Sequence, residues 1–165
     1  MTSNFTNSIF DIEMIGGAAG DQFKIFGLVL FIFLLVDLPM ILVINKKMYA
    51  EQFAKIGPYP KSYGVFLYAL LCYMLMALSL QYFAINQNSL INALVLGLVI
   101  FGIYNTTNLC TLDKYEIKTA AVDIVWGTIL YGIVYLIATL LIHMVPKSDN
   151  VVANAAAVTE TTTEI

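Results

Sequence analysis

Four long apolar runs make up most of this 165-residue chain, and they decide which solvent it folds in. The runs cover residues 23–45, 62–84, 89–110 and 119–145. Each is close to the roughly 20 residues that a helix needs to cross about 30 Å of hydrocarbon. Charged residues are only 12 % of the chain, against about 25 % in soluble domains. We therefore predict an all-α integral membrane protein, a four-helix bundle whose surroundings are the lipid bilayer.

Polar segments flank this predicted membrane domain of residues 23–145. Residues 1–22 contain three acidic residues and no basic one, which does not match a cleaved secretory signal. They are expected to form a polar N-terminal tail, and Asn4 begins a weak N-glycosylation triplet. Residues 146–165 are rich in Ala, Val and Thr and contain no aromatic residue, so a disordered C-terminal tail is expected.

The connections between the runs differ in length. The first, residues 46–61, ends in a segment with two prolines and is predicted to be a long loop. The second, residues 85–88, is so short that the second and third helices are expected to be antiparallel neighbours. Ser62 and Ser89 are placed to act as N-caps of these two helices.

The distribution of lysines gives the expected orientation. All eight basic residues are lysines, and six of them fall in the first and third connections. The positive-inside rule then places these connections in the cytoplasm and both termini on the non-cytoplasmic side. The sequence does not indicate which membrane, a cellular host membrane or a virion membrane.

Polar residues within the runs form the candidate site. At 1.5 Å per residue, three helices of alternating direction bring these residues to the same, cytoplasmic half of the bilayer. We therefore expect one polar cluster, with Trp126 as either an interfacial anchor or a hydrogen-bond donor. Its members are Asp37, Asn105, Thr107, Asn108, Asp123 and Trp126.

The two acids in this set are expected to differ. Asp123 lies near the start of its helix, where the partial positive charge of the helix terminus favours a carboxylate. Asp37 lies deep in its helix, where a carboxylate costs roughly 2.5–3.5 kcal/mol on insertion scales. Pro39 leaves a backbone carbonyl free nearby and is expected to kink the helix. We expect Asp37 to be protonated or to face a wet cavity. Gly127, one turn after Asp123, is expected to allow close helix approach.

Other chemistry has little support in the sequence. A single histidine does not make a metal site, and there is no nucleophile–base set or phosphate-binding loop. No basic stripe indicates nucleic-acid binding, and no cofactor is indicated. We therefore expect a non-enzymatic protein, with an intramembrane enzyme acting on lipid as the least favoured alternative.

Two segments carry a resemblance to a known family. Tyr104-Asn-Thr-Thr-Asn-Leu is followed by Asp123-Ile-Val-Trp-Gly127. Together with Asp37 and Met48-Tyr49, this resembles an uncharacterised family of small four-helix membrane proteins found in bacteria and some large DNA viruses. The family usually has aspartate where this chain has Asn105, and often Trp where it has Met40. The resemblance implies four membrane helices and no particular activity.

Two functions remain open at this point. In the first, the polar cluster binds or transports a small polar solute, an ion or a proton, with Asp37 titrating. A carrier with only four spans is expected to act as a homo-oligomer. In the second, the protein is a structural scaffold or envelope component, and the cluster only fixes helix packing. An Asp37→Asn change separates them, because a scaffold should tolerate it and a proton-coupled carrier should not.

Overall fold

The computed structural model describes residues 19–57 and 63–144, which form four long apolar helices and one short helix. No strand occurs within these residues. The elements are α2 (Ala19–Pro39), η1 (Met40–Ile44), α3 (Lys46–Ile56), α4 (Tyr63–Leu80), η2 (Gln81–Ile85), α5 (Leu90–Thr111) and α6 (Ile117–Met144). Here η1 and η2 are π-helical turns that continue α2 and α4.

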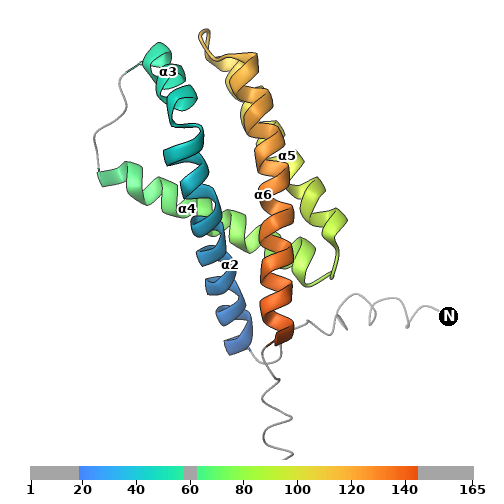
Figure 1. The fold of residues 1–165 in the computed structure, drawn as a ribbon. Helices are drawn as coiled ribbons and strands as arrows, with labels where there is room; N and C mark the ends of the chain where they lie inside the picture. The colour runs from blue at the N-terminus through green and yellow to red at the C-terminus, as the bar shows by residue number, and fades with distance from the viewer. Residues whose placement is uncertain (1–18, 58–62, 145–165) are drawn as a thin grey trace, which may run out of the picture.

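The prediction of a four-helix membrane protein is confirmed. The helices long and apolar enough to span a bilayer are Gly20–Ile44, Gly64–Ile85, Leu90–Thr111 and Ile117–Met144. The first residues of α2 and the last residues of α6 lie at the same end of the molecule (Figure 1). The predictions for residues 1–18, for the Ser62 cap and for residues 145–165 fall outside the described residues. Ser89 does cap α5, and its hydroxyl accepts from the backbone N–H of Asn92 at 3.2 Å.

The tightest packing in the bundle is between α5 and α6, where glycines let the backbones approach. A Cβ added to Gly97 would lie 2.6 Å from the carbonyl oxygen of Gly127. A Cβ added to Gly127 would lie 2.0 Å from Cγ of Phe101. The close approach expected at Gly127 is therefore observed. Because lipid supplies no hydrophobic force between helices, such close contact is what holds them together.

Next to this pair, α2 packs on α6 and also contacts α4. The centre of the core lies at the α2–α6 crossing, where the rings of Phe33 and Tyr131 meet edge to face at 5.0 Å. Both side chains are fully buried.

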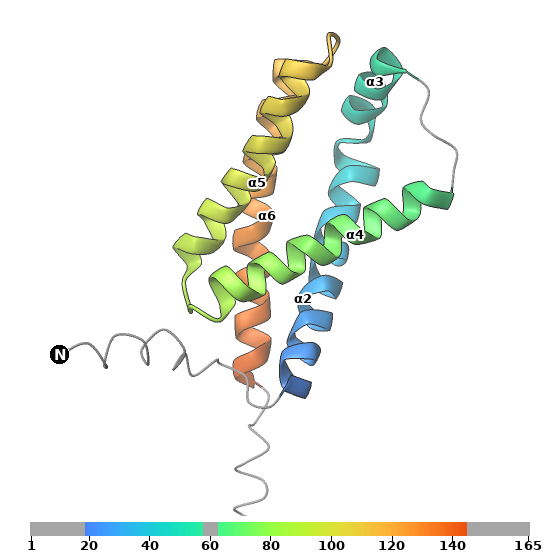
Figure 2. The same cartoon turned by 180° about the vertical axis from the view of Figure 1, so that it is seen from behind.

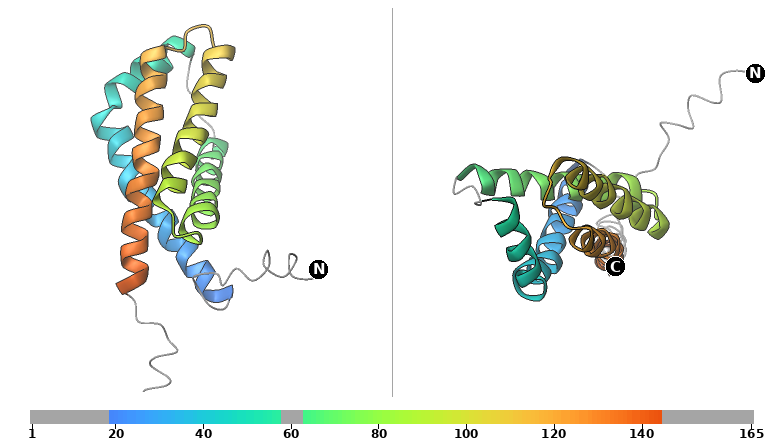
Figure 3. Two further views of the ribbon diagram at one scale, coloured as in Figure 1. Left: turned by 90° about the vertical axis from the view of Figure 1, so that its right-hand side faces the viewer. Right: turned by 90° about the horizontal axis from the view of Figure 1, so that it is seen from above.

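Helix α4 departs from the expected antiparallel arrangement. It runs obliquely across the bundle, and its first half points away from α5 and α6 (Figures 2 and 3). Its contact with α5 is confined to the end next to the connecting turn, where η2 packs on α5. The short connection therefore fixes proximity at one point only, and packing on α2 sets the direction of α4.

The first connection is also different from the prediction. Residues 46–56 form helix α3 and not a loop. Tyr49, Gln52 and Phe53 are spaced three and four apart, which places them on one face of a helix. This short amphipathic helix lies beside the α5–α6 connection at the end of the bundle opposite the described chain ends (Figure 1).

Candidate functional site

The side chain of Asp37 in α2 lies inside the bundle and accepts hydrogen bonds from two other helices. Its side chain is only 5 % exposed. Its carboxylate accepts from the hydroxyl of Tyr73 in α4 at 2.8 Å and from Nε1 of Trp126 in α6 at 2.7 Å. Asp37 therefore faces polar neighbours within the protein, and Trp126 is a donor to the cluster.

Asp123 of α6 is the second buried acid, 8 % exposed. Its carboxylate accepts from the hydroxyl of Tyr49 in α3 at 2.7 Å and from the amide of Asn105 in α5 at 2.6 Å. The Asn105 amide oxygen in turn accepts from the hydroxyl of Tyr115 at 2.7 Å. We call these seven residues the acid network: Asp37, Tyr49, Tyr73, Asn105, Tyr115, Asp123 and Trp126.

The electrostatic stabilisation expected from the helix terminus does not extend to the Asp123 carboxylate. Helix α6 begins at Ile117, two residues earlier than predicted, so Asp123 is beyond its first turn. The field of a helix terminus falls off within that turn. The carboxylate is held instead by Tyr49 and Asn105, which come from two other helices.

Every donor to the two acids is electrically neutral. The ion pairs among the described residues are Lys24–Asp21, Lys47–Glu51 and Lys55–Glu116, and none includes a network acid. Burial, and for Tyr49 also the adjacent Asp123, raises the pKa of the Tyr49 and Tyr115 hydroxyls above the usual tyrosine range. Both hydroxyls therefore stay protonated and act as donors at any physiological pH.

Two residues predicted for the cluster are not among the acid network. Thr107 is exposed on the outer surface of α5. It lies two residues from Asn105, about 200° around the helix, which explains why the two side chains diverge. Asn108, three residues from Asn105, is half-buried and lies against Tyr115 at the edge of the network.

A cavity of about 930 Å³ reaches both acids. One wall is α4, and the other walls come from α2, α3, α5 and the start of α6. Asp37, Asp123, Tyr49 and Tyr73 face it, while most of the remaining lining is aliphatic or aromatic. No lysine or arginine lines it within the described part of the chain. Its size is at the upper end of the roughly 300–1,000 Å³ typical of small-molecule sites.

One hydroxyl in this cavity has no partner. Thr119 is 1 % exposed and lines the cavity next to Asp123 on α6, and its Oγ1 makes no hydrogen bond to any described residue. A buried hydroxyl left without a partner costs about 1–3 kcal/mol. The start of α6 therefore retains unused hydrogen-bonding capacity among the residues that line the cavity.

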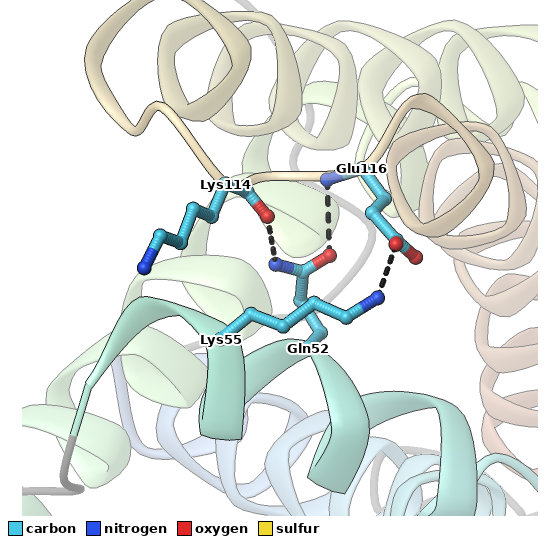
Figure 4. Close-up of polar contacts among 4 residues, drawn as sticks. All are labelled: Gln52, Lys55, Lys114 and Glu116. Atoms are coloured by element: carbon cyan, nitrogen blue, oxygen red, sulfur yellow. Dashed lines mark hydrogen bonds and ion pairs between the residues drawn. The ribbon is translucent and has the colours of Figure 1, made fainter.

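Helix α3 is attached to the α5–α6 connection by polar contacts (Figure 4). The buried side chain of Gln52 donates to the carbonyl of Lys114 at 2.9 Å and accepts from the N–H of Glu116 at 3.0 Å. The Lys55 ammonium pairs with the Glu116 carboxylate beside it. Because Gln52 also lines the cavity, these bonds form part of its wall.

Three tyrosines and Gln52 were not predicted as members of the site. Tyr73 was assigned to the membrane belt or the core, as most membrane tyrosines are. Tyr49 and Gln52 were missed because their segment was expected to be a loop, although Tyr49 belongs to the Met48-Tyr49 pair of the family resemblance. The helical spacing of Tyr49, Gln52 and Phe53 was the available signal.

The described residues contain no group of His, Cys, Asp and Glu side chains arranged to hold a metal ion. What they contain is two buried acids, each held by its own neutral donors, at the edge of a large, mostly apolar cavity. Such an arrangement can recognise a positively charged or hydrogen-bond-donating group on a largely apolar molecule.

Comparison with known proteins gives the family. Residues 22–140 match the family model described as "Predicted membrane protein (DUF2177)". The chain belongs to this family. The match extends from the first to the last apolar helix and includes the acid network, and it agrees with the resemblance seen in the sequence. No curated protein and no solved structure matches the chain.

Proposed function

We propose that this DUF2177 member is a membrane-embedded binding protein whose cavity holds a small molecule with a positively charged group at Asp37 and Asp123. The observation that carries this proposal is the cavity that reaches both buried acids and has no basic residue in its described lining.

The energetics favour a cation. Each carboxylate can accept about four hydrogen bonds, and each network acid receives two. A charged acid at membrane depth costs roughly 2.5–3.5 kcal/mol, which neutral donors offset only in part. A bound cation would offset more of that cost.

The lysines suggest the side on which the site lies. Lys46, Lys47, Lys55, Lys114 and Lys118 belong to α3 or to the connection and first turn around the start of α6. By the positive-inside rule this end is cytoplasmic. Transport is the natural extension of the proposal, with release of the solute on the opposite side and with a dimer or larger homo-oligomer as the working unit.

The binding proposal can be tested with the single tryptophan of the chain. Trp126 donates to Asp37, so a ligand at Asp37 should change its fluorescence. We expect a saturable change when hexylammonium is added to protein in liposomes and no such change with hexanol. The change should weaken by about tenfold or more in Asp37→Asn, since a hydrogen bond to a charged group contributes about 1.5–3 kcal/mol.

The matched control is Asp113→Asn, an acid-to-amide change at an exposed position of the α5–α6 connection. It should bind hexylammonium as the unchanged protein does. If Asp37→Asn fails to assemble, Asp123→Asn provides the same comparison. Equal responses to hexylammonium and hexanol would reject the proposal.

A structural scaffold is the second candidate, and one observation favours it. The acid network joins α2, α3, α4, α5 and α6, so it could serve only to fix helix packing. A scaffold predicts that Asp37→Asn assembles normally, because asparagine keeps the shape, and that hexylammonium has no effect on either protein. A carrier predicts normal assembly together with loss of methylammonium uptake into liposomes.

A further inference from the structure

We propose that the natural occupant of the cavity is a single-chain lipid amine, a long-chain amphiphile with a cationic head, that enters from the bilayer between α4 and α5. This deepens the proposed function and rests on it, because the head would bind the same two acids. The occupant class follows from how polar and apolar groups are distributed in the cavity, from its side opening and from its charge.

The cavity is itself amphipathic. Its polar groups come largely from α3, the start of α6 and Asp37 near the end of α2. The lining from the second half of α4 and from the middle of α5 is largely apolar, including Leu75, Met76 and Ile100. A small hydrophilic solute would leave this apolar portion without matching contacts, whereas an alkyl chain would fill it.

The apolar portion is continuous with the outer surface of the bundle. Leu78 of α4 and Tyr104 of α5 line the cavity and yet are 54 % and 55 % exposed. They stand on the two helices that separate away from the connecting turn (Figure 2). In a bilayer, side chains exposed at this position contact acyl chains, so the cavity opens sideways to lipid.

The end toward the α5–α6 connection is closed by comparison. Tyr49 is bonded to Asp123, and both amide atoms of Gln52 are bonded to the connection. A molecule that enters from the side would therefore place its leading polar head beside the acids and leave its chain toward the opening. Thr119 also lines this polar end.

Charge selects among the lipid classes. A fatty acid or a lipid phosphate would bring negative charge to a cavity that has two acids and no basic residue in its described lining. A neutral lipid would fill the apolar part and leave the acids without a counter-charge. An amine head donates up to three hydrogen bonds and carries the complementary charge.

The test uses hexadecylamine with bromine atoms on its chain, because bromine quenches tryptophan fluorescence on contact. The brominated amine, acid and alcohol of the same length are each added to protein in liposomes at equal membrane mole fractions. We expect saturable quenching of Trp126 by the amine and only weak, unsaturable quenching by the other two. Asp37→Asn should weaken amine quenching by about tenfold or more, and Asp113→Asn should not.

The possible outcomes separate this inference from the proposed function. Binding of hexylammonium without quenching by the long amine would leave the proposed function standing and reject the lipid amine. Equal quenching by all three brominated lipids would show a cavity filled by acyl chains without selection of the head, which also rejects it. Absence of binding by both amines would reject both proposals. Asp123→Asn replaces Asp37→Asn if the latter does not assemble.

Discussion

Helices α6 and α4 are both long and apolar, but they are packed in opposite ways. Helix α6 buries Leu130, Tyr131 and Val134 and presents glycines to α5. Helix α4 leaves large side chains such as Phe66 and Leu67 facing outward and touches α5 only near the turn. An apolar sequence is enough to place a helix in a bilayer, whereas small residues at matching heights decide whether another helix packs closely against it. The protein thus combines a tightly packed α5–α6 pair with a helix, α4, that leaves many large apolar side chains exposed.

The largest loss of stability is expected at the close contact between α5 and α6. Gly127→Ala would place a methyl group 2.0 Å from Cγ of Phe101, whose ring also packs edge to face on Tyr131. We expect about 3 kcal/mol of destabilisation, the upper end for overpacked sites, measured by titration of the detergent-solubilised protein with SDS. Gly102→Ala on α5 is the control, because nothing lies within 4 Å of its added Cβ. Equal stability of the two variants would contradict close α5–α6 packing.

A leucine pair compares the two regions directly. Leu130 of α6 is fully buried and Leu78 of α4 is half exposed. Leu130→Ala should cost about 2 kcal/mol, the low end for a buried leucine because the transfer contribution is small in lipid. Leu78→Ala should lower the free energy of unfolding by about 0.5 kcal/mol or less. Similar losses in the same SDS titration would mean that α4 packs as tightly as α6.

The attachment of α3 to the hairpin should have an intermediate effect. Gln52→Leu leaves the Lys114 carbonyl and the Glu116 N–H without their partners, at a cost of about 1.5 kcal/mol. The same change at the exposed neighbour Glu51 should cost less. Hydrogen exchange of the α3 amides checks this, and faster exchange in Gln52→Leu alone is expected. Unchanged exchange would show that α3 is held by other contacts.

The smallest effect concerns the polar attachment of α4. Tyr73→Phe removes one hydrogen bond to Asp37 and should cost about 0.6 kcal/mol, the average for such bonds in membrane proteins. Tyr68→Phe, on the exposed side of the same helix, is the control and should be neutral. A double change with Asp37→Asn measures the coupling, and additive losses would show that the two side chains do not interact.

The sequence was most informative about which segments lie in lipid and least informative about the direction in which each helix runs through the bundle. The spans, the Ser89 cap and the grouping of Asp37, Asn105, Asp123 and Trp126 could be predicted, because hydropathy and depth along a helix are local properties. The rotation of Thr107 away from the cluster could also have been read from the helical period. The direction of α4 could not, since it depends on packing with α2 rather than on the length of the turn. The tyrosine donors depend on that same direction, because Tyr73 reaches Asp37 only through the α2–α4 crossing.

The π-helical turn η1 controls the angular position of everything after it. In η1 the N–H of Asn45 bonds to the carbonyl of Met40, five residues back, at 2.8 Å. Such a turn accommodates more residues than an α-helical one. Deleting one residue between Met40 and Ile44 would restore the four-residue repeat and rotate α3 by about 100° about its axis. Tyr49 would then swing away from Asp123, so the number of residues between Asp37 and helix α3 is fixed to the single residue.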